Sequence, residues 1–261
     1  MTKNDLDLIK KWFSYYCRSH YSSIEDDQKN IALKELHSYN VCRNAIRIGK
    51  EIGLNEQAML LVEVTGLLHD VGRFEQYAEY KTFRDSSSVN HGMLGAQEIT
   101  KKRVLQGLVP EERDLVLDVV KYHNAFVVPD LKDERKMLFL KIVRDADKLD
   151  IWRVFKEYYQ NPEDTASAVN LGLPDSDNYS QDIISCIKEK RIGKLSDAKT
   201  LTDFKLLQLS WVYDLNFSIS TRIAIEQGYV DIIEQQLPET DEIKNALAVL
   251  NSYLKERALL E

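Results

Sequence analysis

Helix breakers are scarce in this chain. Ten glycines and five prolines are spread over 261 residues, and apolar residues recur at the spacing of an amphipathic helix in one segment after another. No segment shows a credible strand pattern, and there is no internal repeat. The sequence therefore predicts an all-α fold, with helices over residues 3–19, 28–52, 56–71, 91–105, 111–123, 133–160, 178–191, 201–227 and 240–259.

Two segments interrupt this pattern. Residues 73–90 have weak periodicity and are predicted to form an ordered loop after Gly72, which is expected to end the preceding helix. Residues 161–178 contain proline, glycine and several aspartates, and they are the best candidate for a boundary. We expect a single all-helical domain over residues 1–261, with a core at about 28–160 and a C-terminal helical extension at about 175–261.

Charge and composition limit the partners. A net charge of −7 disfavours binding to long nucleic acids, because phosphate neutralisation by basic faces supplies most of that affinity. No apolar run is long enough to span a membrane, and the N-terminus lacks the apolar stretch of a signal peptide. Three separated cysteines without a C-x-x-C pair are typical of buried, reduced thiols. These features predict a cytoplasmic protein with a small-molecule partner, and they leave a homo-oligomer open.

The histidines fall where a helix should face the core. His37 follows Leu33 on an apolar stripe, and Asp147 follows Val143 in the same way. A single inward histidine is more often a hydrogen-bonded core residue than a metal ligand, and a buried aspartate can be ion-paired instead. The coincidence favours metal binding, because four of the five histidines and two carboxylates occupy such positions: His37, His69, Asp70, His91, His123 and Asp147.

Two local motifs make the pattern more specific. Residues 67–73, Leu-Leu-His-Asp-Val-Gly-Arg, resemble an apolar-apolar-His-Asp-Ile-Gly signature, and residues 143–150 contain Asp-Ala-Asp-Lys-Leu. Together with the order of the histidines, these motifs resemble the HD superfamily of metal-dependent phosphohydrolases, over about residues 31–155. The resemblance implies an HD-domain helical bundle with additional C-terminal helices. The metal ligands would converge at the centre of this bundle.

The resemblance also implies how the ligands are shared. One divalent metal would take His37, His69, Asp70 and Asp147, and a second would share Asp70 and add His91 and His123. Two ions roughly 3.5–4 Å apart can activate a bridging hydroxide and neutralise charge on a phosphoryl group. Imidazole and carboxylate ligands without thiolate suit Fe, Mn, Co, Ni or Zn and do not distinguish among them.

Several nearby side chains are candidates for substrate contact. Arg73 stands where related enzymes carry a lysine near the scissile phosphate, although it is also placed to cap the helix carbonyls from the surface. Gln76 and Arg84 are further candidates for substrate binding. Asp150 and Lys148 are expected to orient ligands, and Asn90 to cap the helix that begins at His91. An aromatic segment, residues 209–217, is expected to be core.

Three function classes remain. The first is a phosphohydrolase that acts on a small phosphorylated substrate, a phosphoester or nucleotide, through a metal-activated hydroxide, with Asp70 and Arg73 as catalytic residues. The second is a di-iron oxygenase of the HD fold that acts on a polyol or phosphonate. The third is a regulatory protein without turnover, which the full set of six ligands disfavours. A Gly-Tyr-Pro motif of cyclic dinucleotide hydrolases is missing near the ligands.

Overall fold

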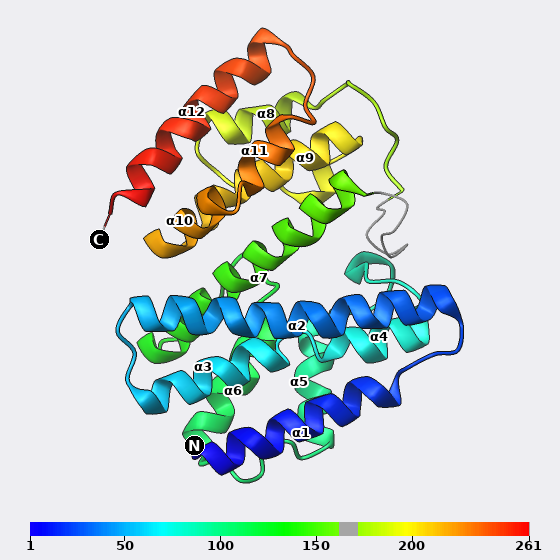
Figure 1. Cartoon of the computed structure of the whole chain (residues 1–261), viewed down its shortest axis with the longest axis vertical. Coiled ribbons are helices and arrows are strands. Elements are labelled where there is room, and N and C mark those ends of the chain that lie inside the picture. Colours follow the sequence, from blue (N-terminus) through cyan, green and yellow to red (C-terminus); the bar gives the residue numbers. More distant parts are fainter. Residues whose placement is uncertain (162–171, 261) are drawn as a thin grey trace. The chain divides into compact units, whose positions relative to one another are not determined.

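The computed structural model describes residues 1–161 and 172–260. Within these ranges it contains helices and connecting segments but no strand, so the predicted all-α fold is confirmed (Figure 1). The described chain forms two compact units, Met1–Asp150 and the described residues from Ile151 onward. Most of the segment predicted as a boundary, residues 162–171 of 161–178, lies outside the described residues. No described helix is long and apolar enough to cross a membrane.

The first unit carries all the predicted metal ligands. Asn90 caps the helix that begins at His91, as predicted, and Asn55 caps the helix that begins at Glu56, since each side chain accepts a hydrogen bond from a backbone N–H in the first turn. The unit contains α1 (Lys3–Ser19), α2 (Glu25–Glu51), α3 (Glu56–Leu68), α4 (Gly72–Tyr80), the 3-10 turn η1 (Asp85–Ser87), α5 (His91–Lys101), α6 (Pro110–Tyr122) and the first part of α7 (Glu134–Gln160).

The prediction of a loop over residues 73–90 was wrong in its first half. Gly72 begins α4 instead of ending the previous helix, and α3 stops earlier, at Leu68. The helical periodicity of α4 is hard to see because Phe74 and Tyr77 are its buried apolar residues while a glutamine, Gln76, is fully buried beside them. A buried polar residue breaks the apolar stripe that the prediction relied on.

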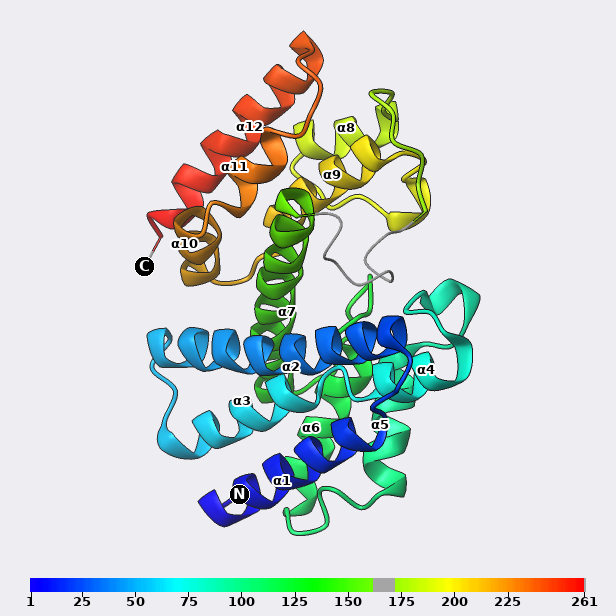
Figure 2. The same cartoon turned by 45° about the vertical axis from the view of Figure 1, so that its right-hand side comes forward.

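Glycines allow the ligand-bearing helices to approach closely. A Cβ atom on Gly72 would lie 2.6 Å from the backbone nitrogen of Gly95, so α4 and α5 touch through their main chains. A Cβ on Gly66 would lie 3.0 Å from the Cα of Cys42, where α3 packs antiparallel to α2 (Figure 2). These contacts bring the C-terminal part of α3 close to α2 and the first residue of α4 close to α5.

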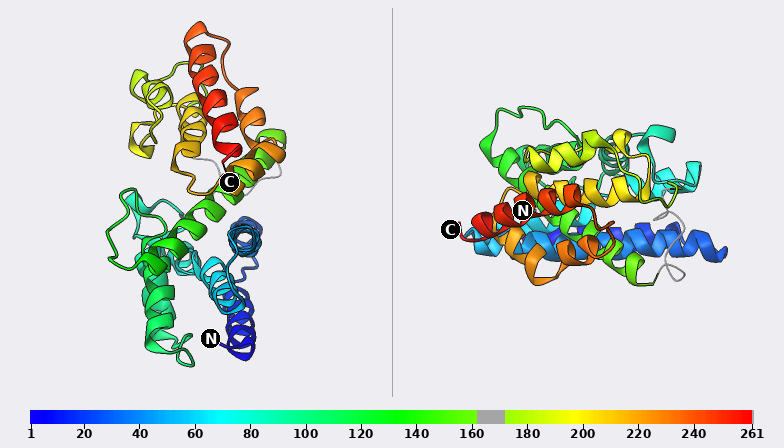
Figure 3. Two further views of the ribbon diagram at one scale, coloured as in Figure 1. Left: turned by 90° about the vertical axis from the view of Figure 1, so that its left-hand side faces the viewer. Right: turned by 90° about the horizontal axis from the view of Figure 1, so that it is seen from above.

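The second unit also consists of helices (Figure 3). The predicted helix 201–227 is interrupted, because η5 follows α9 and an extended residue, Phe217, precedes α10. In the aromatic segment, Leu209, Val212 and Leu215 are buried, whereas its aromatic residues are partly exposed, so core packing holds for the aliphatic positions. The unit contains the end of α7, α8 (Gln181–Lys188), η4 (Leu195–Asp197), α9 (Leu201–Ser210), η5 (Trp211–Asp214), α10 (Ser218–Glu226), α11 (Tyr229–Glu234) and α12 (Asp241–Ala258).

Candidate metal centre

Five segments of the first unit bring the six predicted ligands together. Their side chains meet in three overlapping groups whose ligand atoms lie within 4.8 Å of one another. The four histidines and Asp70 are at most 3% exposed, and the side chain of Asp147 is 18% exposed. The ligands are His37 on α2, His69 and Asp70 in the turn after α3, His91 at the start of α5, His123 directly after α6, and Asp147 on α7.

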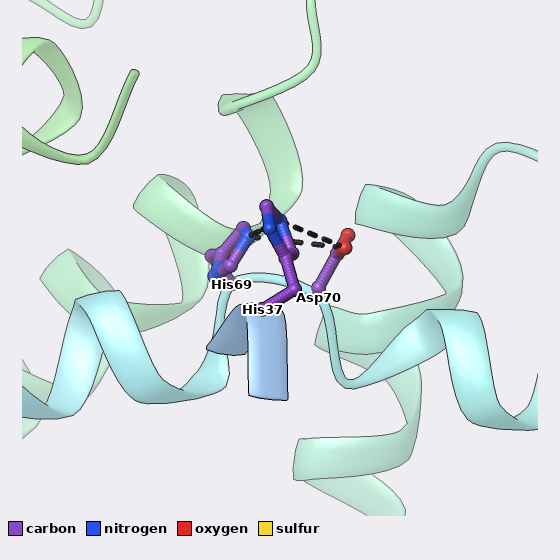
Figure 4. A group of neighbouring side chains, drawn as sticks. All are labelled: His37, His69 and Asp70. Carbon is purple, nitrogen blue, oxygen red and sulfur yellow. Dashed lines mark hydrogen bonds and ion pairs between the residues drawn. The ribbon is translucent and has the colours of Figure 1, made fainter. Parts of the chain in front are cut away.

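Asp70 lies between two pairs of histidines. Its Oδ2 atom is 3.5 Å from Nε2 of His37 and 3.8 Å from Nε2 of His69 (Figure 4). Its Oδ1 atom is 3.3 Å from Nε2 of His91 and 3.7 Å from Nε2 of His123. Each oxygen of one carboxylate therefore faces one histidine pair, as a bridging carboxylate would.

The two histidine pairs differ in their second carboxylate. Asp147 lies beside the first pair, with Oδ1 at 3.0 Å from Nε2 of His37 and 3.7 Å from Nε2 of His69. Asp147 also groups with His123 within 4.8 Å, whereas among the described residues only Asp70 groups with both His91 and His123. Two carboxylates therefore face both histidines of the first pair, and one carboxylate faces both histidines of the second.

Two of the imidazole rings are fixed by the main chain. Nδ1 of His69 donates to the carbonyl of Gly66 at 2.8 Å, and Nδ1 of His123 donates to the carbonyl of Val120 at 2.7 Å. Both histidines directly follow a helix, where the last carbonyls lack partners within the helix. Because a carbonyl only accepts, Nδ1 carries the proton in both rings and Nε2 faces the centre.

The other two rings are fixed by carboxylates. Nδ1 of His37 donates to Oδ2 of Asp150 at 2.7 Å, which agrees with the orienting role expected of Asp150. Nδ1 of His91 donates to Asp85, with its two oxygens at 2.8 and 2.9 Å. Asp85 was missed by the sequence reasoning, because it lies in η1, outside any helical stripe. Such hydrogen bonds fix the tautomer and raise the basicity of a ligating histidine.

Electrostatics keep most of these groups in the form that binds a metal. Burial favours protonation of Asp70, but nearby cations hold the pKa of its carboxyl well below the usual range. The pKa of Asp147 is also held well below the usual range despite burial, by His37 and His69 beside it. Burial, with Arg73 nearby, lowers the pKa of His91 to about 3. For His37 burial disfavours charge, yet hydrogen bonds to two carboxylates raise its pKa to about 9.

The inward nitrogens fit a cation. Nε2 of His37 is 3.2 Å from Nε2 of His69, and Nε2 of His91 is 3.0 Å from Nε2 of His123. Two imidazole lone pairs at such distances repel each other unless a proton or a metal ion lies between them. The clustered nitrogens and carboxylates could therefore hold divalent transition metals, which prefer these ligand types.

Two cations lie beside the bridging carboxylate. Nζ of Lys34 donates to Oδ2 of Asp70 at 2.9 Å, and Nε of Arg73 is 3.4 Å from Oδ1. Both side chains are slightly exposed, at 16% and 15%, and both lie over the ring of Phe83. Lys34 was missed, although it lies three residues before His37 on α2 and therefore near the same helix face.

The remaining substrate candidates differ in position. Gln76 is fully buried, and its amide donates to Asp85, Ser88 and Val89, so it holds the segment after α4 in place. Arg84 is exposed. In the described structure its backbone N–H donates to Thr82 and its backbone carbonyl accepts from Ser88. A substrate contact by Gln76 or Arg84 stays a prediction.

Comparison with known proteins points to one family. The family model described as HD domain matches residues 36–152, a range that includes all six predicted ligands. No curated protein and no solved structure matched the chain significantly. The match covers less than half of the chain, and the converging His and Asp side chains lie within it, so residues 36–152 are similar to the HD-domain family.

Proposed function

We propose that this protein is a metal-dependent phosphohydrolase that acts on a small phosphoester or nucleotide. The observation that carries the proposal is the position of Lys34 and Arg73, which lie on either side of the Asp70 carboxylate. Two fixed cations beside a candidate metal centre favour an anionic substrate. They favour a phosphoester over a neutral polyol, one of the two substrate classes of the alternative oxygenase; a phosphonate, the other class, is anionic as well.

The ligand arrangement supports two metal positions. His37, His69, Asp70 and Asp147 would hold one ion, as the distances around Asp147 suggest. Asp70, His91 and His123 would hold the other. When bound, two such ions supply a hydroxide nucleophile at neutral pH and neutralise charge on the phosphoryl group.

The chain's own residues would bind and orient the phosphoryl oxygens. The Lys34 ammonium and the Arg73 guanidinium are mostly buried, where their attraction for an anion is screened less than at the surface. The ring of Phe83 lies 5.1 Å from Nζ of Lys34 and 5.9 Å from Cζ of Arg73, so it supports both cations by cation–π contacts.

The test is a turnover screen of the metal-loaded protein. Protein loaded separately with Mn²⁺, Fe²⁺, Co²⁺, Ni²⁺ or Zn²⁺ is assayed for phosphate release from phosphomonoesters and nucleotides and for product formation from phosphodiesters. The proposal predicts turnover with at least one substrate. Oxygen uptake by the iron-loaded protein with a polyol or phosphonate, without phosphoester hydrolysis, would support the oxygenase instead. Absence of any turnover would favour a regulatory protein.

A lysine variant tests the observation directly. Lys34→Met should lower kcat/KM for the phosphoester about 10- to 1,000-fold, because it removes one charge that faces the developing oxyanion. Lys29→Met is the matched control, since Lys29 lies on the same helix but pairs with Glu25 on an exposed face. Equal kcat/KM values for the two variants would contradict the role of Lys34.

A further inference from the structure

One carboxylate connects the candidate metal centre to the cations beside it. Asp85 accepts hydrogen bonds from His91 through both oxygens, at 2.9 and 2.8 Å. Its Oδ1 also accepts from Nη1 of Arg73 at 3.0 Å. Amide groups from Gln76 and Asn124, each at 3.0 Å, complete the set. The donors come from α4, from α5 and from the residues after α6, so the carboxylate is held from several sides.

The same carboxylate therefore constrains two groups with different expected roles. His91 belongs to the second histidine pair, and Arg73 is one of the two cations beside Asp70. If Asp85 is lost, His91 can adopt the other tautomer, in which Nε2 carries a proton and cannot ligate. Arg73 would lose an ion-pair partner at the same time.

At the first metal position a different carboxylate fixes the ring. Asp150 fixes His37 as Asp85 fixes His91, at 2.7 Å. Arg73 hydrogen-bonds Asp85, and no hydrogen bond from Arg73 to Asp150 is present within the described residues. At the second position only Asp70 lies within ligand distance of both His91 and His123, so its occupancy depends strongly on the orientation of His91.

We infer that Asp85 is a positioning residue that couples the second metal position to the binding of a phosphate group. The inference rests on the proposed metal centre, and it deepens the proposed function by naming how the second ion is regulated. Asp85 holds the His91 ring in position to ligate the second ion, and it holds the Arg73 guanidinium in position to bind a phosphate group. Both groups are therefore aligned by the same carboxylate. The second ion and the phosphate should then bind cooperatively, each strengthening the other by the same factor.

The test measures binding and does not require turnover. Mn²⁺ is titrated into the metal-free full chain by isothermal titration calorimetry, with and without inorganic phosphate, and spin coupling between two ions is followed by electron paramagnetic resonance. In the wild type we expect two ions, with the weaker one bound at least about fivefold more tightly in the presence of phosphate. A wild type that binds one ion, or two ions indifferent to phosphate, overturns the inference.

Two matched variants separate the two positions. Asp85→Asn should weaken the second ion about 10- to 100-fold, remove the coupled spin signal at limiting Mn²⁺ and abolish the effect of phosphate, while the first ion is retained. Asp150→Asn should weaken the first ion instead. Equal weakening of both ions by Asp85→Asn, or no change in the second, would refute the positioning role.

A third variant covers a failure of Asp85→Asn to fold, which thermal unfolding would reveal. Arg73→Met leaves Asp85 on His91 but removes the guanidinium. Phosphate should then lose its effect on the second ion while that ion still binds. If phosphate strengthens the second ion as much as in the wild type, the coupling does not pass through Arg73 and the inference fails. Cooperative binding without turnover of any phosphoester would refute the proposed function and leave this inference standing.

Discussion

The contact between α4 and α5 at Gly72 makes a quantitative prediction. A Cβ on Gly72 would lie 2.6 Å from the Gly95 nitrogen and nearer still to the carbonyl oxygen of His91, whereas ordinary van der Waals contact begins at 3.4 Å. The shortfall to the nitrogen is 3.4 − 2.6 = 0.8 Å, and both neighbours are main-chain atoms that a rotamer change cannot move. Gly72→Ala must therefore push the two helices apart.

The expected cost follows from that shortfall. Overpacking a well-packed contact costs about 1–3 kcal/mol, and a main-chain clash belongs at the upper end, about 3 kcal/mol. The gain from replacing a helical glycine by alanine offsets about 1 kcal/mol of this. Gly72→Ala should thus lower the free energy of unfolding by about 2 kcal/mol. Because the added Cβ also displaces the backbone of His91, the affinity for the second metal ion should fall.

The assay is urea unfolding of the metal-free protein, followed by Mn²⁺ titration of the same variant. Gly49→Ala is the matched control, because Gly49 lies in the last turn of α2 and its Cβ would meet the flexible end of Met59, with the sulfur at 2.9 Å. The free energy of unfolding of Gly49→Ala should equal that of the wild type or slightly exceed it. Equal unfolding free energies for the two variants, or Gly72→Ala with the wild-type affinity for both ions, would refute the packing argument.

Three further predictions follow from the same structure. Asp70→Ala should abolish the binding of both metal ions and all activity, because Asp70 faces both histidine pairs; retention of one ion, measured by metal analysis, would count against a bridging role. His91→Ala should weaken only the second ion, and a wild type with a single ion unaffected by this change would defeat the two-metal arrangement. Burial raises the pKa of Cys42 to about 12, so at pH 8 about one thiol in 10⁴ is ionised. Native protein should therefore react far more slowly with a thiol reagent than denatured protein, and comparable rates would show that Cys42 is accessible.

The fold class and the inward histidines could be predicted because helical periodicity is a strong signal over long segments. His37 and Asp147 each sit in a helix of 27 residues, where an apolar stripe identifies the inward face. Asp150 could be named as an orienting residue because it lies three residues after Asp147, on the same face. Lys34 was available by the same spacing from His37 and was overlooked.

Other features had no periodic signal. Helix α4 has nine residues and a buried glutamine, so its apolar pattern resembles that of a loop. Asp85 lies in a three-residue turn, and its position against His91 and Arg73 depends on how α4, α5 and α6 pack together. Such contacts between distant segments follow from tertiary structure and not from local spacing. The assignment of the six ligands to metals stays a prediction.

The hydrogen bonds of His69 and His123 to main-chain carbonyls have a consequence for how easily mutation can damage this centre. Every amino acid supplies a carbonyl, so no side-chain replacement at Gly66 or Val120 deletes the acceptor. Half of the imidazole orientations are thus encoded by the ends of two helices. The rings of His37 and His91 instead depend on the side chains of Asp150 and Asp85, which one substitution each can remove. Random substitution should therefore disturb the orientation of His37 and His91 more often than that of His69 and His123.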